Sequence, residues 1–232
     1  MKKSTFYTEL AYVLGIVILA LGTALMERAD LGVSMVVAPA YLLHLKLVQI
    51  FPFFSFGMAE YTLQAVVLLL MIAVLRKARL YYLFSFVTAV IYGFTLDGAI
   101  ALAALLPVPA GLVGQLLNFL PGMLLCSIGV CLLFQTYIPP EVYELFVKEL
   151  SAKFGWDIHK CKTCYDCVSC LVAVVLSFLF FGLWHFEGVK LGTVFCALFN
   201  GALIHVCTKF FDHFWAFRDR FPAARNKLSH TH

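Results

Sequence analysis

The longest uncharged stretch of the chain sets the first limit on its fold. Between Gly98 and Pro140 there is no Asp, Glu, Lys or Arg. A helix crosses a bilayer with about 20 apolar residues, so a run of this length must fold back on itself. Over all 232 residues, 62% are hydrophobic and 13% are charged, whereas a soluble domain has about 25% charged residues. The sequence therefore predicts an all-α polytopic membrane protein embedded in the lipid bilayer.

Six apolar stretches are long enough to cross the membrane as helices. We expect spans at Glu9–Met26, Tyr61–Leu75, Leu80–Leu105, Asn118–Tyr137, Asp166–Trp184 and Lys190–Phe211. No small-residue cleavage pattern follows the first stretch, so we expect it to be a span and not a cleaved signal peptide.

Two further segments are too irregular or too polar to be spans. Leu31–Ala59 is hydrophobic but is interrupted by Gly and Pro, which predicts a re-entrant or interfacial helix and a return loop. Glu141–Phe154 places Val142, Leu145 and Phe146 at helical spacing. This pattern predicts an amphipathic helix at the membrane surface.

Lys and Arg are distributed unevenly over the predicted loops. With six spans and the N-terminus inside, 14 of the 17 Lys and Arg residues fall on the inner side, and only Arg28, Lys46 and Lys190 fall outside. By the positive-inside rule, both termini are expected in the cytoplasm. Because the charges follow the loops and form no single basic patch, we do not expect nucleic acid as a partner.

The two halves of the chain are similar to each other. Leu21–Ser34 resembles Ile128–Glu141, 107 residues later, and Ser85–Asp97 resembles Thr193–His205 at an offset of 108. Three spans per half is an odd number, so the halves enter the membrane from opposite sides. Such inverted repeats are typical of secondary transporters. We expect a first repeat over residues 1–112, a second over 113–212 and a basic cytoplasmic tail over 213–232.

Several short motifs resemble those of one family. They are ADLGVS at 29–34, YGFTLD at 92–97, Pro-Pro-Glu at 139–141, KTCYD at 162–166 and LGTV at 191–194. Together they resemble the YczE/YitT-like bacterial integral membrane proteins. The chain departs from that family at Met35 and at Pro140, where the family tends to have Pro and Gly. The resemblance implies a bacterial inner-membrane protein whose biochemical activity is poorly defined.

Four cysteines recur at every third position: Cys161, Cys164, Cys167 and Cys170. C-x2-C units bind iron–sulfur clusters and zinc, so these residues are a candidate metal site. The last gap is one residue shorter than in the cluster motif, and Leu171 stands in place of its proline. On one continuous helix this spacing spreads the thiols around half of the circumference. The other interpretation is that these cysteines are small apolar residues that pack at the start of a helix. We therefore expect no cofactor.

Five residues are candidates for binding a ligand: Ser34, Asp97, Pro140, Glu141 and His205. Ser34 and the Pro140–Glu141 turn precede segments that are expected to be half-helices. Their N-termini would offer backbone N–H groups to an anion. Asp97 in the third span should face a cavity or a partner, or else reach the outer interface. For His205 the alternatives are a packing histidine and a proton relay.

The motifs of common enzymes are absent from the sequence. It contains no nucleophile elbow, P-loop, dinucleotide-binding glycine pattern or HExxH, so we do not expect an enzyme. The first hypothesis is a small-molecule permease of unknown substrate that works by alternating access of the two halves. The alternative is a non-transporting sensor or accessory module with a cytoplasmic metal or redox loop. The sequence leaves open whether the chain forms a homo-oligomer.

The predicted topology can be tested with reporter fusions. Fusions after Lys77, Lys160 and the C-terminus should report the cytoplasm, and fusions after Pro109 and Glu187 should report the outside. A fusion after Lys160 that reports the outside would contradict both the number of spans and the inverted repeat.

Overall fold

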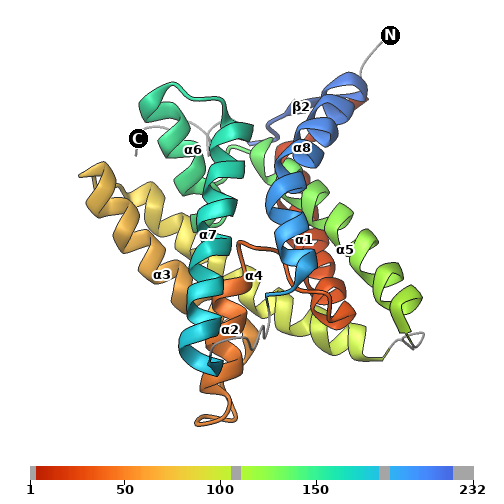
Figure 1. The fold of residues 1–232 in the computed structure, drawn as a ribbon. Coiled ribbons are helices and arrows are strands. Elements are labelled where there is room, and N and C mark those ends of the chain that lie inside the picture. The colour runs from red at the N-terminus through yellow and green to blue at the C-terminus, as the bar shows by residue number, and fades with distance from the viewer. Residues whose placement is uncertain (1–3, 106–110, 183–188, 222–232) are drawn as a thin grey trace.

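The computed structural model describes residues 4–105, 111–182 and 189–221. Over this part the chain forms a helical bundle with one short strand pair (Figure 1). The elements in order are β1 Ser4–Tyr7, α1 Thr8–Ala29, α2 Ala38–Leu47, α3 Phe56–Leu75, α4 Leu80–Ala104, α5 Gly111–Phe134, α6 Val142–Phe154, α7 Ile158–Phe181, α8 Leu191–Phe214 and β2 Trp215–Arg218.

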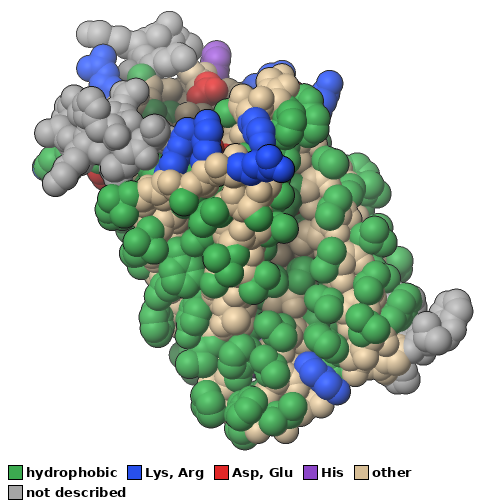
Figure 2. Space-filling view, turned by 90° about the vertical axis from the view of Figure 1, so that its left-hand side faces the viewer, with side chains coloured by type: hydrophobic (Ala, Val, Ile, Leu, Met, Phe, Trp, Pro, Cys, Tyr) green, Lys and Arg blue, Asp and Glu red, His purple; other side chains and the backbone are tan. Residues whose placement is uncertain are grey.

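Six of these helices, α1, α3, α4, α5, α7 and α8, are long and apolar enough to cross a membrane. Their outward faces carry large apolar side chains, such as Leu69, Phe94 and Leu179, which are 67%, 69% and 72% exposed. Figure 2 shows a mostly apolar face, with Lys and Arg gathered chiefly at its upper end. Water would not favour such a surface, whereas lipid does. The prediction of a polytopic helical membrane protein is thus confirmed.

Three helices begin several residues earlier than the sequence predicted: α3, α7 and, at Gly111 instead of Asn118, α5. α3 begins at Phe56, because the Ser55 side chain accepts a hydrogen bond from the Met58 N–H group. α7 begins at Ile158, because the Asp157 side chain accepts from the N–H groups of His159 and Lys160. Such N-cap bonds satisfy backbone donors at a helix start. The earlier starts of α3 and α7 place charged residues such as Glu60 and Lys162 inside helices.

α6 is the predicted helix, but its predicted place at the membrane surface is wrong for its first half. Every residue from Val142 to Val147 is buried, including the charged Glu144. α6 packs against α3, α4 and α7, so it enters the bundle between them. The helix has a polar side that contacts other polar side chains in the interior, and amphipathic spacing cannot distinguish this from contact with water.

The contact between α1 and α5 is the most extensive in the bundle. The two helices approach through glycines: Gly15 of α1 lies against Gly129 of α5, and Gly22 lies against Gly122. A Cβ atom at Gly22 would lie 2.7 Å from both the Cys126 nitrogen and the Gly122 oxygen. Small residues let membrane helices pack backbone to backbone, which is the main source of attraction between apolar helices in lipid.

The other helices are arranged around this pair. α4 packs on α1 and α3, α8 packs on α5 and α7, and α2 packs on α3 and α7. The largest cluster of buried apolar side chains draws residues from α1 to α5, from α7 and from α8. A second, smaller cluster lies where α3, α4 and α6 meet, so the interior is one large core with a smaller one beside it.

The segment before α1 and the segment after α8 are joined by a parallel strand pair that the sequence did not predict. Ser4–Tyr7 pairs with Trp215–Arg218, and the Glu9 carboxylate accepts hydrogen bonds from the backbone N–H groups of Arg220 and Phe221. β1 and β2 therefore lie on the same side of the bundle, as an even number of spans requires. The first described residues of the predicted tail continue α8 to Phe214 and then form β2.

The glycine contact predicts a large difference between two Gly→Ala substitutions. Gly22→Ala should lower the stability by about 1–3 kcal/mol, because overpacking forces backbones apart. Gly98→Ala on α4 is the control, since no atom lies within 4 Å of the added methyl group. It should leave the melting temperature in detergent unchanged or raise it slightly. Equal melting temperatures for the two variants would contradict the close α1–α5 contact.

Candidate functional site

A closed polar cavity lies in the centre of the bundle. Every residue that lines it is buried, with 8% or less of its surface exposed. The lining residues are Leu19, Thr23, Ser34, Val36, Val37, Tyr92, Cys126, Val130, Glu141, Tyr143, Glu144, Lys162 and Asn200. The cavity has room of about 20 Å³ for the centres of water-sized molecules, which is enough for about one water.

Three charged residues form a buried ion cluster at the cavity. The Lys162 ammonium lies 3.0 Å from the Glu144 carboxylate and 3.1 Å from the Asp166 carboxylate. The side chains of these three residues are 1%, 4% and 0% exposed. Charges removed from water are tolerated only when they are closely paired. One ammonium between two carboxylates leaves this cluster with an excess of negative charge.

Glu141 adds a further carboxyl group to the same cavity. Its Oε2 accepts a hydrogen bond of 2.8 Å from Gln64 Nε2. Gln64 is itself oriented by the Val142 N–H group, which donates to its Oε1 at 2.9 Å. Among the described residues, Glu141 Oε1 has no hydrogen-bond partner. Burial, together with the nearby carboxylates of Glu144 and Glu60, raises the pKa of Glu141 well above its usual value.

Around the cavity the uncharged polar groups are bonded to one another. Thr23 and Tyr92 share a hydrogen bond of 3.0 Å between their hydroxyl oxygens. The Ser127 hydroxyl donates to Asn200 Oδ1 at 2.8 Å. These bonds tie α1 to α4 and α5 to α8. Among the described residues that line the cavity, the buried side-chain oxygen left without a hydrogen-bond partner is therefore Glu141 Oε1.

The structure brings Ser34, Pro140 and Glu141 together and separates Asp97 and His205 from them. Ser34 and Glu141 both line the central cavity. Pro140 is next to it, and its carbonyl oxygen accepts a hydrogen bond from the Ser85 hydroxyl. The two chain breaks, near Ser34 and near Pro140, therefore meet in one place.

Asp97 is not among the lining residues of the central cavity. Its carboxylate accepts hydrogen bonds from the Ser55 hydroxyl at 2.7 Å and from the Gly57 N–H group at 2.8 Å. It therefore holds the first turn of α3 against α4. A carboxylate at a helix N-terminus is stabilised by the free N–H groups there, so Asp97 faces a hydrogen-bonding partner, one of the alternatives that the sequence left open.

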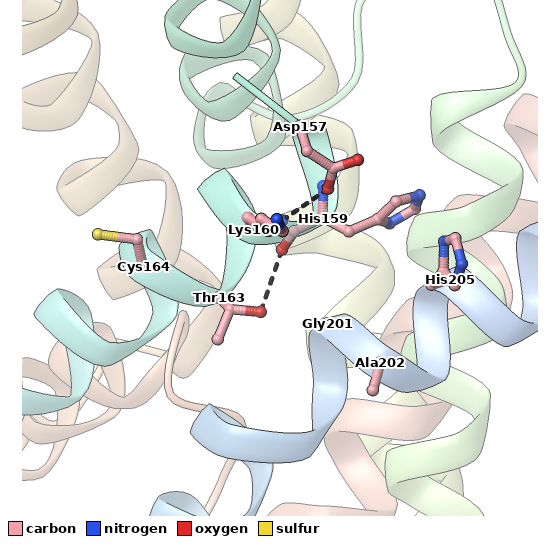
Figure 3. A pocket seen from close by; sticks show the side chains of 8 residues that line it. All are labelled: Asp157, His159, Lys160, Thr163, Cys164, Gly201, Ala202 and His205. Atoms are coloured by element: carbon pink, nitrogen blue, oxygen red, sulfur yellow. Dashed lines mark hydrogen bonds between the residues drawn. The ribbon is translucent and has the colours of Figure 1, made fainter.

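His205 lies in a second, wider pocket at one end of α7 and α8, with a volume of about 650 Å³. Its ring is near that of His159, with 4.6 Å between the ring centres. Figure 3 shows the two imidazoles facing each other across the gap between α7 and α8, beside Asp157 and Thr163. His205 therefore lines this second pocket and not the central cavity.

The four cysteines of the predicted metal motif all lie on α7. Cys161 and Cys170 are buried, whereas Cys164 and Cys167 are exposed. Among the described residues, no group of three or more His, Cys, Asp or Glu side chains is placed to hold a metal ion. The early start of α7 explains this, since a regular helix distributes the thiols over different faces.

Sequence reasoning missed the ion cluster. The predicted span began at Asp166, eight residues after the start of α7, so Lys162 fell in a predicted loop and Asp166 at a helix end. One signal was available: Lys162 and Asp166 are four residues apart, the spacing at which opposite charges meet on a helix. Glu144 and Gln64 reach the cavity from α6 and α3, which no local pattern indicates.

The ion cluster predicts a strong effect of removing its cation. Lys162→Met should lower the stability by about 3–5 kcal/mol, because it leaves two buried carboxylates without their partner. The triple variant Lys162→Met, Glu144→Gln, Asp166→Asn should recover most of the loss, since neutral groups need no cation. Thermal unfolding in detergent measures both. A Lys162→Met protein as stable as the wild type would show that Lys162 is not the counter-ion.

Comparison with protein families gives one match, which covers residues 6–209 and is described as Family of unknown function (DUF6198). No curated protein and no solved structure matches the chain. The resemblance to the YczE/YitT-like proteins therefore stays a prediction. Every residue that lines the central cavity falls within the match. Because the match covers well over half of its length, the chain belongs to DUF6198, a family of unknown function.

Proposed function

We propose that this membrane protein is a small-molecule permease whose two inverted halves give alternating access to the central cavity. In this proposal the structure corresponds to a closed state. The protein would reside in the bacterial inner membrane with both termini in the cytoplasm, and it would not be an enzyme. The proposal rests on the internal correspondence of the two halves and on the chemistry of the cavity between them.

The contacts between helices support the correspondence. If α1 to α4 are matched in order with α5 to α8, the contact of α3 with α4 corresponds to that of α7 with α8. The contact of α1 with α4 corresponds to that of α5 with α8, and that of α2 with α7 corresponds to that of α6 with α3. Inverted repeats produce such pairs of contacts.

The glycines of the α1–α5 contact follow the same rule. Gly15 and Gly122 are 107 positions apart, and so are Gly22 and Gly129. Gly15 lies against Gly129, and Gly22 lies against Gly122. The offset of 107 positions therefore maps the Gly15–Gly129 contact onto the Gly122–Gly22 contact, as a two-fold axis between antiparallel helices would require.

The residues lining the cavity carry the proposal. Every lining residue except Lys162 has a counterpart in the lining, 107 or 108 positions away. The pairs are Leu19 and Cys126, Thr23 and Val130, Ser34 and Glu141, Val36 and Tyr143, Val37 and Glu144, and Tyr92 and Asn200. A cavity on the axis between two halves is where transporters of inverted repeats bind their substrates.

The paired positions differ in chemistry, which favours a polar or charged substrate. Ser34 and Val37 in the first half correspond to Glu141 and Glu144 in the second. Ionisable groups inside a membrane bundle are costly and typically lie on substrate or proton pathways. A merely structural core could hold apolar residues at these positions at a lower cost.

A thermal-shift screen against metabolites tests whether the cavity binds a substrate. We expect a compound that raises the melting temperature of the wild type in detergent. Ser34→Leu should abolish that shift because the larger side chain fills the cavity. Thr62→Leu, on an exposed position of α3, is the matched control and should keep it. If cationic, anionic and neutral metabolites all leave the wild type unchanged, the cavity is not a substrate site.

Uptake separates a permease from the sensor or accessory module that is the alternative. The stabilising compound should accumulate in proteoliposomes that contain the wild type, but not in empty liposomes or in those with Ser34→Leu. A compound that binds without crossing would contradict transport and favour the sensor.

A further inference from the structure

We propose that Glu141 Oε1 binds one proton in the closed cavity and that this proton is the coupling ion of the transporter. The coupling role rests on the proposed function, whereas the proton-binding site rests on the geometry of the cavity alone. The site consists of Glu141, the Gln64 amide that orients it, and the ion cluster next to it.

The hydrogen bonds around Glu141 determine which of its oxygens would carry the proton. The Val142 N–H group donates to Gln64 Oε1, so the Gln64 Nε2 group faces Glu141 as the donor. Glu141 Oε2 is therefore an acceptor, and the carbonyl oxygen of a carboxylic acid is the better acceptor, which favours Oε1 as the protonated oxygen. Oε1 has no partner among the described residues, and Glu141 is 2% exposed. A buried carboxylate oxygen without a partner is costly, and a proton on Oε1 removes that cost.

The charges around Glu141 disfavour its ionised form. Glu60 faces it from α3, Glu144 from α6, and Lys162 with Asp166 from α7. The uncharged but titratable side chains near the same carboxyl group are Tyr12 of α1, Tyr92 of α4, Cys126 of α5 and Tyr143 of α6.

Among the described residues, Lys162 is the cation of this group, and it already contacts two carboxylates. Without Glu141, this ion cluster has one positive and two negative charges. An ionised Glu141 would add another negative charge in a place of low dielectric constant. A neutral, protonated Glu141 avoids this repulsion.

The size and the ligands of the cavity favour a proton over a metal ion. The space accommodates about one water. The part of the chain that the structure describes has no cluster of three or more His, Cys, Asp or Glu side chains arranged for a metal ion. A proton needs only one carboxylate oxygen and a neighbouring water.

The proton would be exchanged as the cavity opens. When water enters from one side, the Oε1–H bond breaks, the proton passes to water, and the carboxylate keeps the bonding pair. When the cavity opens to the other side, the carboxylate takes a proton from water and becomes neutral again. No other reactant is required, and the ion cluster remains unchanged.

Infrared difference spectra between acidic and alkaline buffer test the proton site directly. The full chain in lipid nanodiscs should show the C=O stretch of a protonated carboxyl group, which is lost as the pH rises. Glu141→Gln should lose this band, and Glu141→Asp should retain a titrating carboxyl band. Glu60→Gln is the matched control, because Glu60 is also fully buried and its Oε1 also lacks a partner among the described residues, but it does not line the cavity. This variant should keep the band that Glu141→Gln removes. A titrating band that persists in Glu141→Gln and disappears in Glu60→Gln would overturn the assignment.

Gln64→Met keeps the test decisive if Glu141→Gln fails to fold. It removes the hydrogen bond to Glu141 Oε2, so the band should shift to higher frequency while still titrating. An unshifted band would show that it belongs to another residue, and sodium-dependent loss of the band would show that the site binds sodium.

The two proposals can fail separately. If the band is assigned to Glu141 but no stabilising compound enters proteoliposomes, the proton site stands and transport is wrong. If a compound is taken up equally with and without a pH gradient, transport stands and the proton is not its coupling ion.

Discussion

The close contact of α1 with α5 is the interaction on which the rest of the bundle depends. In lipid, apolar side chains gain little by leaving their surroundings, so helices must attract one another through close packing. Gly22 and Gly122 allow this by bringing two backbones together. The same contact sets the place of the cavity, because Leu19 packs against Gly129 and also lines the cavity.

The cavity combines two costs that a stable core would avoid. One is irregular backbone near Ser34 and Pro140, where the chain passes from a spanning helix to a shorter one. The other is a set of buried charges around Lys162. Irregular backbone at membrane depth is tolerated only where protein or a cavity surrounds it. Buried charges stabilise little compared with apolar residues. Their joint occurrence in one place supports the proposed binding role of the cavity.

Asp97 and His205 occupy matching positions in the sequence repeat, but their side chains make different kinds of contact. Asp97 and His205 are 108 positions apart and lie on α4 and α8. Asp97 contacts the first turn of α3 and His205 lies beside the first turn of α7. Their places in the two halves agree, yet one is a hydrogen-bonded cap and the other faces a second histidine. The position follows from the fold, and the chemistry follows from the side chain.

The sequence by itself determined the six spanning helices and the extent of α6, because hydropathy and helical spacing act locally. Only the tertiary structure decided that Glu144 of α6 and Lys162 of α7 meet inside the bundle. It also placed Asp97 outside the cavity and spread the α7 cysteines over different faces. A charged residue near a helix end has the same local pattern whether it faces water or a buried partner. Which of the two occurs depends on packing between segments that are distant in the chain.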